Sequence, residues 1–402
     1  MYGVGRIWRL NVRIFEYVED GTMSTPVPVY SGVQPIRVSL TNVAGLGATQ
    51  LVRSLLPHLE EVPGFQIEEI YLPNRGELCQ YRRKVAGIAP TVYRRLIPNS
   101  LSRVLECTLF GYLFSGTTPI LVLGDLPIRC KTRQVVFVQS PHVIRGTMRI
   151  GGASAFKYLF ARAIFRLNLR YVAAFIVQTQ SIKAALAAGY PGIDEKIHVI
   201  SQPPPSWLLK SGMRRVGRDP KGDACLHLFY PAACYPHKNH RLLGTIDAAG
   251  VDNWGNVQLA LTIPEDRNPN VNISWIKCVG RLSPREMLSF YEKADALLFL
   301  SLAESYGLPL VEAMWVGLPI ICPDLPYARA LCGDRAIYFN PKSVESLRLA
   351  VSDLRERLAL GWWPDWTDRL RAIPKGWDEV AGMMLQITGL HDRHPACQRQ
   401  SL

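Results

Sequence analysis

The stretch from Ala296 to Pro323 constrains the fold more than any other part of the chain. It begins with the uncharged apolar run ALLFLSL (296–302), which is typical of a strand buried on both faces of a parallel sheet. A short loop with Gly307 follows, and apolar residues then recur at helical spacing from Leu310 onward. Strand, glycine loop and helix in this order indicate an α/β fold with a parallel sheet.

The start of that helix has the features of an anion site. Its first N–H groups lack partners within the helix and lie at the positive end of the helix dipole, and Gly307 lets a phosphate approach the backbone. Glu304 and Glu312 flank this helix start. A carboxylate beside a bound anion needs a different partner, and the hydroxyls of a sugar or a ribose could donate hydrogen bonds to it. Alternatively, Glu304 caps the helix and Glu312 only interacts with the dipole.

The run AESYGLPLVEA (303–313) resembles the E-x7-E element of retaining, nucleotide-sugar-dependent glycosyltransferases of the GT-B type, family 4. The preceding helix and strand (285–300) and the following strand (316–323) resemble the same family. The resemblance covers the C-terminal half well and the N-terminal half more loosely. It implies an α/β fold of the GT-B class, with two Rossmann-like domains facing across a cleft.

The resemblance also implies roles for individual residues. Glu304 would orient the sugar and Glu312 would hold the ribose, while Lys238, in the loop PAACYPHKNH (231–240), would flank the donor diphosphate. Ala233 occupies the position where the family has an arginine, and Arg281 could replace that cation. The donor-binding residues in this half are then Lys238, Ser305, Gly307, Leu308 and Glu312.

The N-terminal half opens with a Rossmann-like unit. A strand at 36–40 is followed by the loop TNVAGLG (41–47) and a helix at 48–59, but position 50 is Gln, so the fingerprint G-x-G-x-x-G fails and no NAD site follows. In the resembled family a glycine-rich loop here lines the cleft, which assigns Gly45 and Gly47 to donor binding.

His142 follows a strand predicted at 135–138. A lone histidine is more often a structural hydrogen-bonding residue, but the family has a histidine here that contacts the transferred sugar. His142 and Glu304 are therefore the two residues that we assign to catalysis. Asp125 also follows a strand, and we interpret it as a cap rather than a ligand.

The pattern of strands and helices predicts the bounds of five segments, and the resemblance implies the roles of the two domains and the return of the last helix to the first domain. The segments are a poorly ordered extension (1–34), an N-terminal acceptor domain (35–205), a linker (206–223), a C-terminal nucleotide-sugar domain (224–372) and a helix that crosses back to the first domain (373–390).

The positive charge is concentrated in the first half of the chain. Residues 1–205 hold 23 Lys and Arg against 12 Asp and Glu, a net +11, whereas residues 206–402 hold 23 against 21, a net +2. A basic face suits nucleic acid, anionic lipid or an acidic substrate, or is simply solvated. No nucleic-acid-binding motif accompanies it, so we expect no nucleic acid and favour a membrane surface or a lipid-linked acceptor.

The remaining composition limits cofactors and location. Nine scattered cysteines without a Cys-x-x-Cys pair indicate free thiols in a reducing compartment. No Asp-x-Asp pair or metal cluster is visible, so we expect no metal and no cofactor besides the nucleotide-diphospho-sugar as co-substrate. We also find no transmembrane helix or signal peptide and expect a cytoplasmic chain, peripheral on the inner membrane at most.

The expected function is transfer of a sugar from a nucleotide-diphospho-sugar to a saccharide or lipid-linked acceptor with retention of configuration, in surface polysaccharide biosynthesis. In the resembled family no protein nucleophile is evident and the leaving phosphate helps to deprotonate the acceptor. Two alternatives stay open. The first is a GT-B nucleotide-sugar epimerase, and the second is a donor-binding protein without turnover, which is suggested by Ala233 at the position of the family's arginine.

Overall fold

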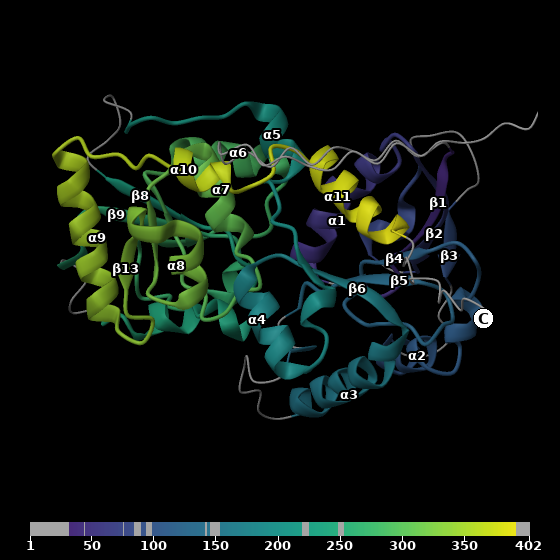
Figure 1. Cartoon of the computed structure of the whole chain (residues 1–402). Helices are drawn as coiled ribbons and strands as arrows, with labels where there is room; N and C mark the ends of the chain where they lie inside the picture. The colour runs from purple at the N-terminus through teal and green to yellow at the C-terminus, as the bar shows by residue number, and fades with distance from the viewer. Residues whose placement is uncertain are drawn as a thin grey trace, which may run out of the picture.

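The computed structural model describes residues 32–43, 45–74, 76–83, 90–93, 99–140, 143–144, 153–218, 225–247 and 253–390. Within them the strands form two separate parallel sheets, one of seven strands and one of six. Figure 1 shows the two sheets in two lobes, each covered by helices. The predicted α/β class with two Rossmann-like domains is confirmed.

The N-terminal sheet has the strand order β3-β2-β1-β4-β5-β6-β7. Its apolar strands are almost fully buried because helices cover both faces, as parallel sheets require. Its strands are β1 (Gln34–Ser39), β2 (Phe65–Pro73), β3 (Thr91–Tyr93), β4 (Ile120–Val122), β5 (Gln134–Phe137), β6 (Val172–Val177) and β7 (Ile197–Val199). Its helices are α1 (Leu46–Leu59), α2 (Asn99–Cys107), α3 (Ala153–Asn168) and α4 (Gln180–Gly189).

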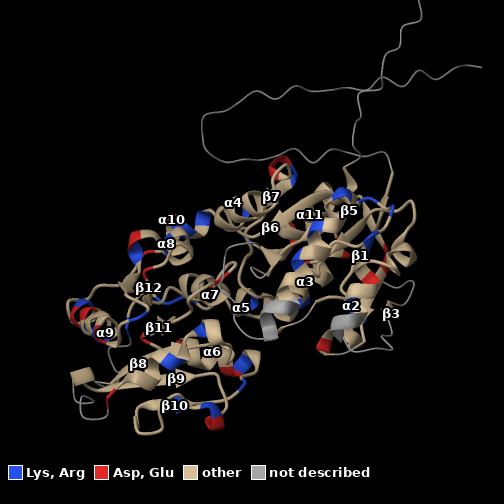
Figure 2. Cartoon of the chain, turned by 90° about the horizontal axis from the view of Figure 1, so that it is seen from below, with Lys and Arg blue, Asp and Glu red and all other residues tan. Residues whose placement is uncertain are grey.

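The C-terminal sheet has the order β10-β9-β8-β11-β12-β13, which is the Rossmann order 3-2-1-4-5-6. Its strands are β8 (Leu226–Tyr230), β9 (Val257–Leu261), β10 (Ile276–Cys278), β11 (Ala296–Leu298), β12 (Ile320–Pro323) and β13 (Ile337–Phe339). Its helices are α6 (Pro284–Lys293), α7 (Leu308–Val316), α8 (Pro326–Cys332), α9 (Val344–Ala359) and α10 (Thr367–Arg371). Charges of both signs alternate on α9, where they form local ion pairs (Figure 2).

Local sequence signals explain how the helices next to the site begin and end. Ser283 and Glu286 form a capping box at the start of α6, in which each side chain bonds the backbone of the other residue. Helix α7 has left-handed glycines at both ends, Gly307 with φ 91° and Gly317 with φ 89°. A Cβ on Gly317 would lie 2.2 Å from the carbonyl oxygen of Arg215, so only glycine fits there.

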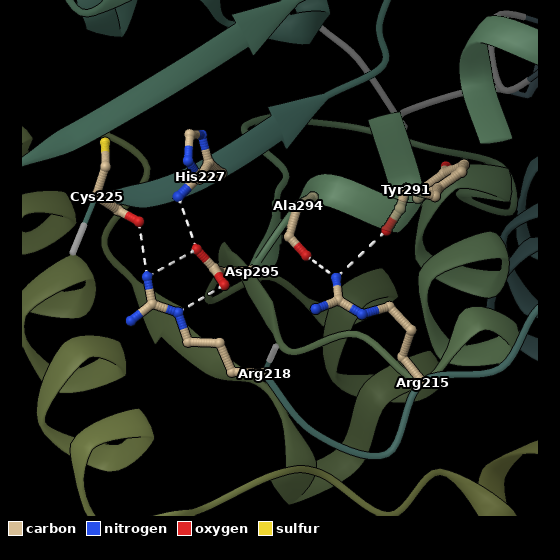
Figure 3. A network of polar contacts seen from close by, with 7 residues as sticks. All are labelled: Arg215, Arg218, Cys225, His227, Tyr291, Ala294 and Asp295. Carbon is tan, nitrogen blue, oxygen red and sulfur yellow. Dashed lines mark hydrogen bonds and ion pairs between the residues drawn. The ribbon is translucent and has the colours of Figure 1, made fainter. Parts of the chain in front are cut away.

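The segment between the domains begins as a helix and is then tied to the C-terminal domain. Helix α5 (Ser206–Ser211) occupies the start of the predicted linker, and Leu208 within it is fully buried. Arg215 then donates to the carbonyl oxygens of Tyr291 and Ala294 (Figure 3). Residues 206–218 are therefore part of the folded structure.

Arg218 makes the second attachment of this segment. Its guanidinium donates to Asp295 at 2.9 Å and to the carbonyl oxygen of Cys225 at 2.7 Å, and Asp295 also accepts the N–H of His227 at 2.9 Å (Figure 3). Because Asp295 directly precedes β11 and His227 lies in β8, the segment is bound to the two central strands of the sheet.

The last helix, α11 (Trp377–Gly389), packs on the N-terminal domain (Figure 1). Trp377, Val380, Met384 and Leu385 are buried in the same apolar cluster as the inner faces of α1 and β1. The indole N–H of Trp377 donates to the carbonyl oxygen of Pro204 at 2.8 Å. The chain thus passes between the two domains twice.

Several elements differ in extent from the expectation. The sequence pattern predicts an apolar helix from about Leu101 to Phe114, but α2 ends at Cys107 and a separate 3-10 turn, η2, covers Gly111–Phe114. Helices α8 and α10 lie in stretches for which no helix was predicted. Residues 1–31 of the expected extension lie outside the described residues, and β1 begins at Gln34.

Candidate functional site

The candidate site lies where the strand order of the C-terminal sheet reverses. Strands β8 and β11 are neighbours in the sheet, but their following helical segments continue in opposite directions along it. Ligands of open α/β sheets bind at this switch point, outside the carboxyl ends of the strands. The loop after β8 carries Lys238, and the loop after β11 carries Glu304, Ser305 and Gly307.

Lys238 and Glu304 meet at this point. The Lys238 Nζ lies 2.5 Å from Glu304 Oε1, and both side chains are largely shielded from solvent, at 14 % and 13 % exposure. The ammonium also lies 5.7 Å from the centre of the Phe299 ring. The structure thus brings together the predicted diphosphate-binding cation and the predicted sugar-binding carboxylate, so a donor entering here would compete for both.

Backbone hydrogen bonds fix the two loops to each other. The carbonyl oxygen of His237 accepts the N–H of Leu302 at 2.7 Å and the hydroxyl of Ser301 at 3.2 Å. The Tyr327 hydroxyl donates to the carbonyl oxygen of Ser301, and the Tyr230 hydroxyl donates to that of Lys238 at 2.7 Å. Both loops are therefore held in place by the buried Tyr230 and the half-buried Tyr327 as well as by the ion pair.

The first turn of α7 supplies the second feature of the site. Gly307 is its N-cap residue, and a Cβ there would lie 3.2 Å from Leu310 Cδ1 in addition to the strained positive φ. The N–H of Leu310 bonds back to the carbonyl oxygen of Gly307, and Pro309 sits in the first turn, where its missing N–H costs nothing. The positive end of α7 thus lies on the same loop as Glu304, with Leu308 as its first residue.

Glu312 is buried within α7, at 3 % exposure. Its carboxylate accepts the Tyr291 hydroxyl at 2.6 Å and the Gln50 amide at 3.3 Å. Burial raises the pKa of Glu312 to about 7, and the bonds from Tyr291 and Gln50 lower it only in part. Glu312 is therefore a half-titrated acid near neutral pH, held by one residue from each domain.

The glycine loop of the N-terminal domain faces α7. Gly45 is the N-cap of α1 with φ 94°, Gly47 lies in the first turn, and a Cβ on either would meet nothing within 4 Å. Gln50, one turn after Gly47, makes the bond to Glu312, so the start of α1 is directed at α7. The open space beside both glycines fits the predicted proximity to a ligand.

Two further contacts join the loop between β11 and α7 (299–307), which we call the donor loop after its predicted role, to the N-terminal domain. The Tyr306 hydroxyl donates to the carbonyl oxygen of Gln202 at 2.6 Å and accepts its N–H at 3.0 Å, and Tyr306 is 2 % exposed. The Thr179 hydroxyl donates to the carbonyl oxygen of Ser305 at 3.4 Å. Because Thr179 and Gln202 follow β6 and β7, the carboxyl edges of the two sheets face each other here.

Sequence reasoning missed Gln50, Tyr291 and Tyr306 as site-forming residues. Gln50 was noted only because it breaks the dinucleotide fingerprint. Tyr306 lies inside the E-x7-E run, and an aromatic residue with a hydroxyl in such a loop is a signal that could have been used.

The remaining predicted residues have mixed outcomes. Arg281, considered as a replacement for the arginine missing at Ala233, is paired with Glu77 of the N-terminal domain. The hydrogen bonds that Glu77 accepts from Arg281 and Arg53 lower the pKa of Glu77.

Asp125 accepts the N–H groups of Gln139 and Ser140 at 2.6 and 2.9 Å, so it caps the segment after β5. His142 lies outside the described residues. Within the described ranges, no three His, Cys, Asp or Glu side chains gather as a metal site would require.

Comparison with solved structures identifies the class of fold. The chain superimposes on sucrose-phosphate synthase from Thermosynechococcus elongatus with a TM-score of 0.60, at 15 % identity over 88 % of this chain and 98 % of that one. It superimposes on WaaG, a glycosyltransferase involved in lipopolysaccharide biosynthesis, with a TM-score of 0.58, at 13 % identity over 87 % and 99 % of the two chains. The expected GT-B fold is thereby confirmed.

Sequence comparison then identifies the domain that carries the site. Residues 267–357, which include Glu304 and Glu312, match the family model described as glycosyl transferases group 1. The chain therefore contains a group 1 glycosyltransferase domain within a GT-B fold, which confirms the resemblance, while the assignment to family 4 stays a prediction.

Curated relatives agree with this domain. The chain is 21 % identical over 283 residues to the O-antigen chain mannosyltransferase RfbU of Salmonella typhimurium, covering 65 % of this chain and 76 % of RfbU. It is 28 % identical over 116 residues to the serotype-specific mannosyltransferase WbdA of Escherichia coli. That match spans 29 % of this chain and only 13 % of WbdA.

Proposed function

We propose that the chain transfers a sugar from a nucleotide-diphospho-sugar to a saccharide or lipid-linked acceptor, with retention of the anomeric configuration, in the synthesis of a surface polysaccharide. The observation that carries this proposal is the Lys238–Glu304 pair beside the first turn of α7 at the switch point. A cation next to a helix N-terminus suits a diphosphate, and an adjacent carboxylate suits sugar hydroxyls.

The proposed chemistry needs no protein nucleophile. The bond between the anomeric carbon and the diphosphate oxygen breaks, the acceptor oxygen bonds to that carbon on the same face, and the acceptor proton passes to the leaving phosphate. Lys238 and the N–H groups at Gly307 and Leu308 stabilise the negative charge that develops on the diphosphate, which lowers the barrier by several kcal/mol in sites of this type. Glu304 holds the sugar, and Glu312 the ribose.

The identity of the sugar is suggested by the relatives. Both RfbU and WbdA are named as mannosyltransferases. Mannose is therefore the first sugar to test, and a nucleotide-diphospho-mannose the first donor. We propose further that the reaction uses neither a metal ion nor a cofactor besides this co-substrate, since the chain carries no Asp-x-Asp pair and Lys238 supplies a positive charge at the site.

The proposed place of action is the cytoplasmic face of a membrane, where a lipid-linked acceptor would be available. Across the described ranges, every helix falls short of the length and apolarity that crossing a bilayer requires. The excess of positive charge in the first half of the chain supports peripheral contact with anionic lipid.

A donor screen followed by product analysis tests this proposal. A panel of nucleotide-diphospho-sugars, with mannose donors first, is added to the full chain and the shift in unfolding temperature is measured. The donor that stabilises the protein is then incubated with and without a saccharide acceptor, in the presence of a chelator. We expect transfer of the sugar with the donor's anomeric configuration, at a rate that the chelator does not change.

The same experiment separates the alternatives. An epimerised sugar formed from donor alone would favour the epimerase, which no comparison favours. Donor binding without transfer to any acceptor would favour a protein that has lost turnover, as the Ala233 substitution allows. A product of inverted configuration, or a rate that collapses with the chelator, would overturn the proposed mechanism but leave the donor site intact.

A further inference from the structure

Seven large apolar side chains are exposed in one region of the N-terminal domain. Leu109, Phe110, Tyr112 and Leu113, in and before η2, are 41–66 % exposed. Leu159, Phe160 and Leu167 on α3 are 58–67 % exposed. Soluble domains rarely leave so many apolar groups together in water, and such a patch marks an interaction site. We refer to these seven residues as the apolar patch.

Helix α3 carries its share of the patch on the face turned away from the sheet. With 3.6 residues per turn, Leu159, Phe160 and Leu167 fall on about one third of the circumference. The buried Phe165 lies on the opposite face, where it packs against Phe175 of β6 and Tyr190 at the end of α4, and the buried Ile164 lies at the border between the two faces. The helix therefore has one apolar face for the core and a second that the fold does not use, where a surface helix normally turns polar residues to solvent.

Hydrogen bonds join the two parts of the patch into one surface. The Asn168 amide, next to Leu167, donates to the carbonyl oxygen of Cys107 at 2.8 Å, and Leu109 and Phe110 follow directly after Cys107. Figure 1 shows α2 and α3 side by side along the lower edge of the N-terminal lobe, and they are also neighbours in Figure 2.

The charges around the patch have a single sign. Residues 99–171 contain ten Lys and Arg but only two acidic residues, Glu106 and Asp125. Glu106 is 3 % exposed, and the Asp125 carboxylate accepts two backbone N–H groups, so neither offsets the basic surface. Arg166 and Arg170 are exposed on α3 and η4 (Leu169–Tyr171).

The basic residues also flank η2. A Cβ on Gly111 would lie 2.3 Å from the carbonyl oxygen of Arg129, so η2 packs directly on that backbone, and the exposed Arg129 and Lys131 border the apolar side chains. A hydrogen bond from Arg129, followed in size by one from Arg170, lowers the pKa of Tyr171. Arg129 therefore lies close to the segment that follows α3.

We propose that the apolar patch and its arginine border dock on an anionic lipid bilayer. Apolar side chains that enter the acyl boundary, bordered by cations that meet lipid phosphates, are what binding to such a surface requires. A second copy of the chain fits less well, because two copies meeting through this face would bring their arginines together.

The direction of α3 relates the apolar patch to the edges of the N-terminal sheet. In a parallel sheet the connecting helix runs opposite to the strands, so α3, between β5 and β6, begins near the carboxyl edge of the sheet and ends away from it. Docking along the length of α3 would therefore place the carboxyl edge, which faces the loop of Glu304, beside the bilayer together with the opposite edge of the sheet. The inference rests on the proposed peripheral contact with anionic lipid and deepens it by naming the surface that makes the contact, and it does not depend on the transfer reaction.

Vesicle flotation of the full chain tests the proposal. Vesicles of phosphatidylethanolamine and phosphatidylglycerol are compared with vesicles of phosphatidylcholine alone. We expect at least tenfold stronger partitioning to the anionic vesicles, weakened by raising NaCl from 0.1 to 0.5 M because salt screens the arginine contacts. The double variant Phe160→Ser/Leu167→Ser should lose at least tenfold, and Arg166→Gln/Arg170→Gln should lose the preference for anionic lipid.

The matched control is Leu349→Ser/Leu360→Ser, which removes two exposed leucines of the C-terminal domain at 54 % and 87 % exposure. It should partition like the wild type. Equal partitioning by the Phe160/Leu167 variant, or no vesicle binding by the wild type, would overturn the proposal. So would sedimentation showing a dimer that this variant abolishes and that excludes vesicle binding. Donor-induced thermal stabilisation, measured on each variant, reports on the transfer proposal separately.

Discussion

The amide of Gln50 donates to the carboxylate of Glu312 at 3.3 Å, although 262 residues separate them in the chain. Gln50 belongs to the first helix of the N-terminal domain and Glu312 to the helix that starts at the donor loop. The same carboxylate is the one assigned to the ribose. A rotation of one domain relative to the other must therefore change the hydrogen bonds of the carboxylate that we propose to bind the ribose.

Replacing Glu304 by alanine should abolish most transfer. The variant loses the carboxylate that we propose to hold the sugar and leaves Lys238 without this partner, so we expect the turnover rate to fall by at least about 100-fold. Initial-rate measurements at saturating donor check this. Glu345→Ala on the exposed α9 is the control and should keep the wild-type rate. Near-normal turnover of the Glu304 variant would remove that residue from the site.

Glu312 should make stability depend on pH around neutrality. Burial raises its pKa from the ordinary 4.5 to about 7, so between these values the folded state binds more protons than the unfolded state. The free energy of unfolding therefore falls as pH rises through this window. The free energy of unfolding of the wild type, minus that of the Glu312→Gln variant, should decrease by on the order of 2–3 kcal/mol between pH 5 and pH 8.

Denaturant unfolding at several pH values measures that difference. The control is Glu345→Gln, since hydrogen bonding by Arg348 lowers the pKa of Glu345 and its titration lies below the window. A wild-type minus Glu312→Gln difference that is flat over the same range would show that the carboxyl titrates normally. Donor binding to Glu312→Ala, which should weaken by about tenfold or more, reports on the ribose role independently.

Tyr306→Phe should destabilise the fold and slow transfer together. The hydroxyl bonds both the N–H and the carbonyl oxygen of Gln202, and its loss leaves two buried backbone groups without that partner. The expected cost is about 1–3 kcal/mol in the free energy of unfolding. Tyr235→Phe, at 46 % exposure, is the matched control and should cost about 0.5 kcal/mol or less. Identical effects of the two variants would mean that Tyr306 is not an anchor.

The two helical glycines, Gly47 in α1 and Gly382 in α11, should separate stability from ligand binding. A Cβ on either meets nothing within 4 Å, so alanine at each should stabilise the fold by about 0.5–1 kcal/mol. Only Gly47 lies in the helix start that we propose to line the donor site, so only Gly47→Ala should raise the KM, by about tenfold. Thermal unfolding and KM measurements on both variants decide this, and an unchanged KM for Gly47→Ala would place the ligand elsewhere.

The order of strands and helices could be predicted because short runs of sequence determine it. The buried run at 296–302 and the left-handed glycines around α7 determine their own conformations, and the structure has strand β11 and helix α7 there. The break of the expected helix after Cys107 could not be predicted in this way, since Gly111 is required by its close approach to Arg129, a tertiary contact.

The site was predictable only where its residues share a short segment. Glu304, Gly307 and Glu312 lie within nine residues, so one run of sequence identifies all three. Gln50 and Gln202 reach the same place from the other domain, and no local pattern reports a contact across 262 or 104 residues. Arg281 could be considered as a phosphate ligand only until its pairing with Glu77 was known.

The return of α11 to the first domain has a consequence for how the chain matures. Trp377, Met384 and Leu385, close to the end of the sequence, complete the core that β1 and α1 begin. During synthesis the first domain therefore keeps an uncovered apolar face until residues 377–389 have emerged. A nascent chain truncated after residue 372 should thus be a target for chaperones and proteases, however well its donor-binding half has folded.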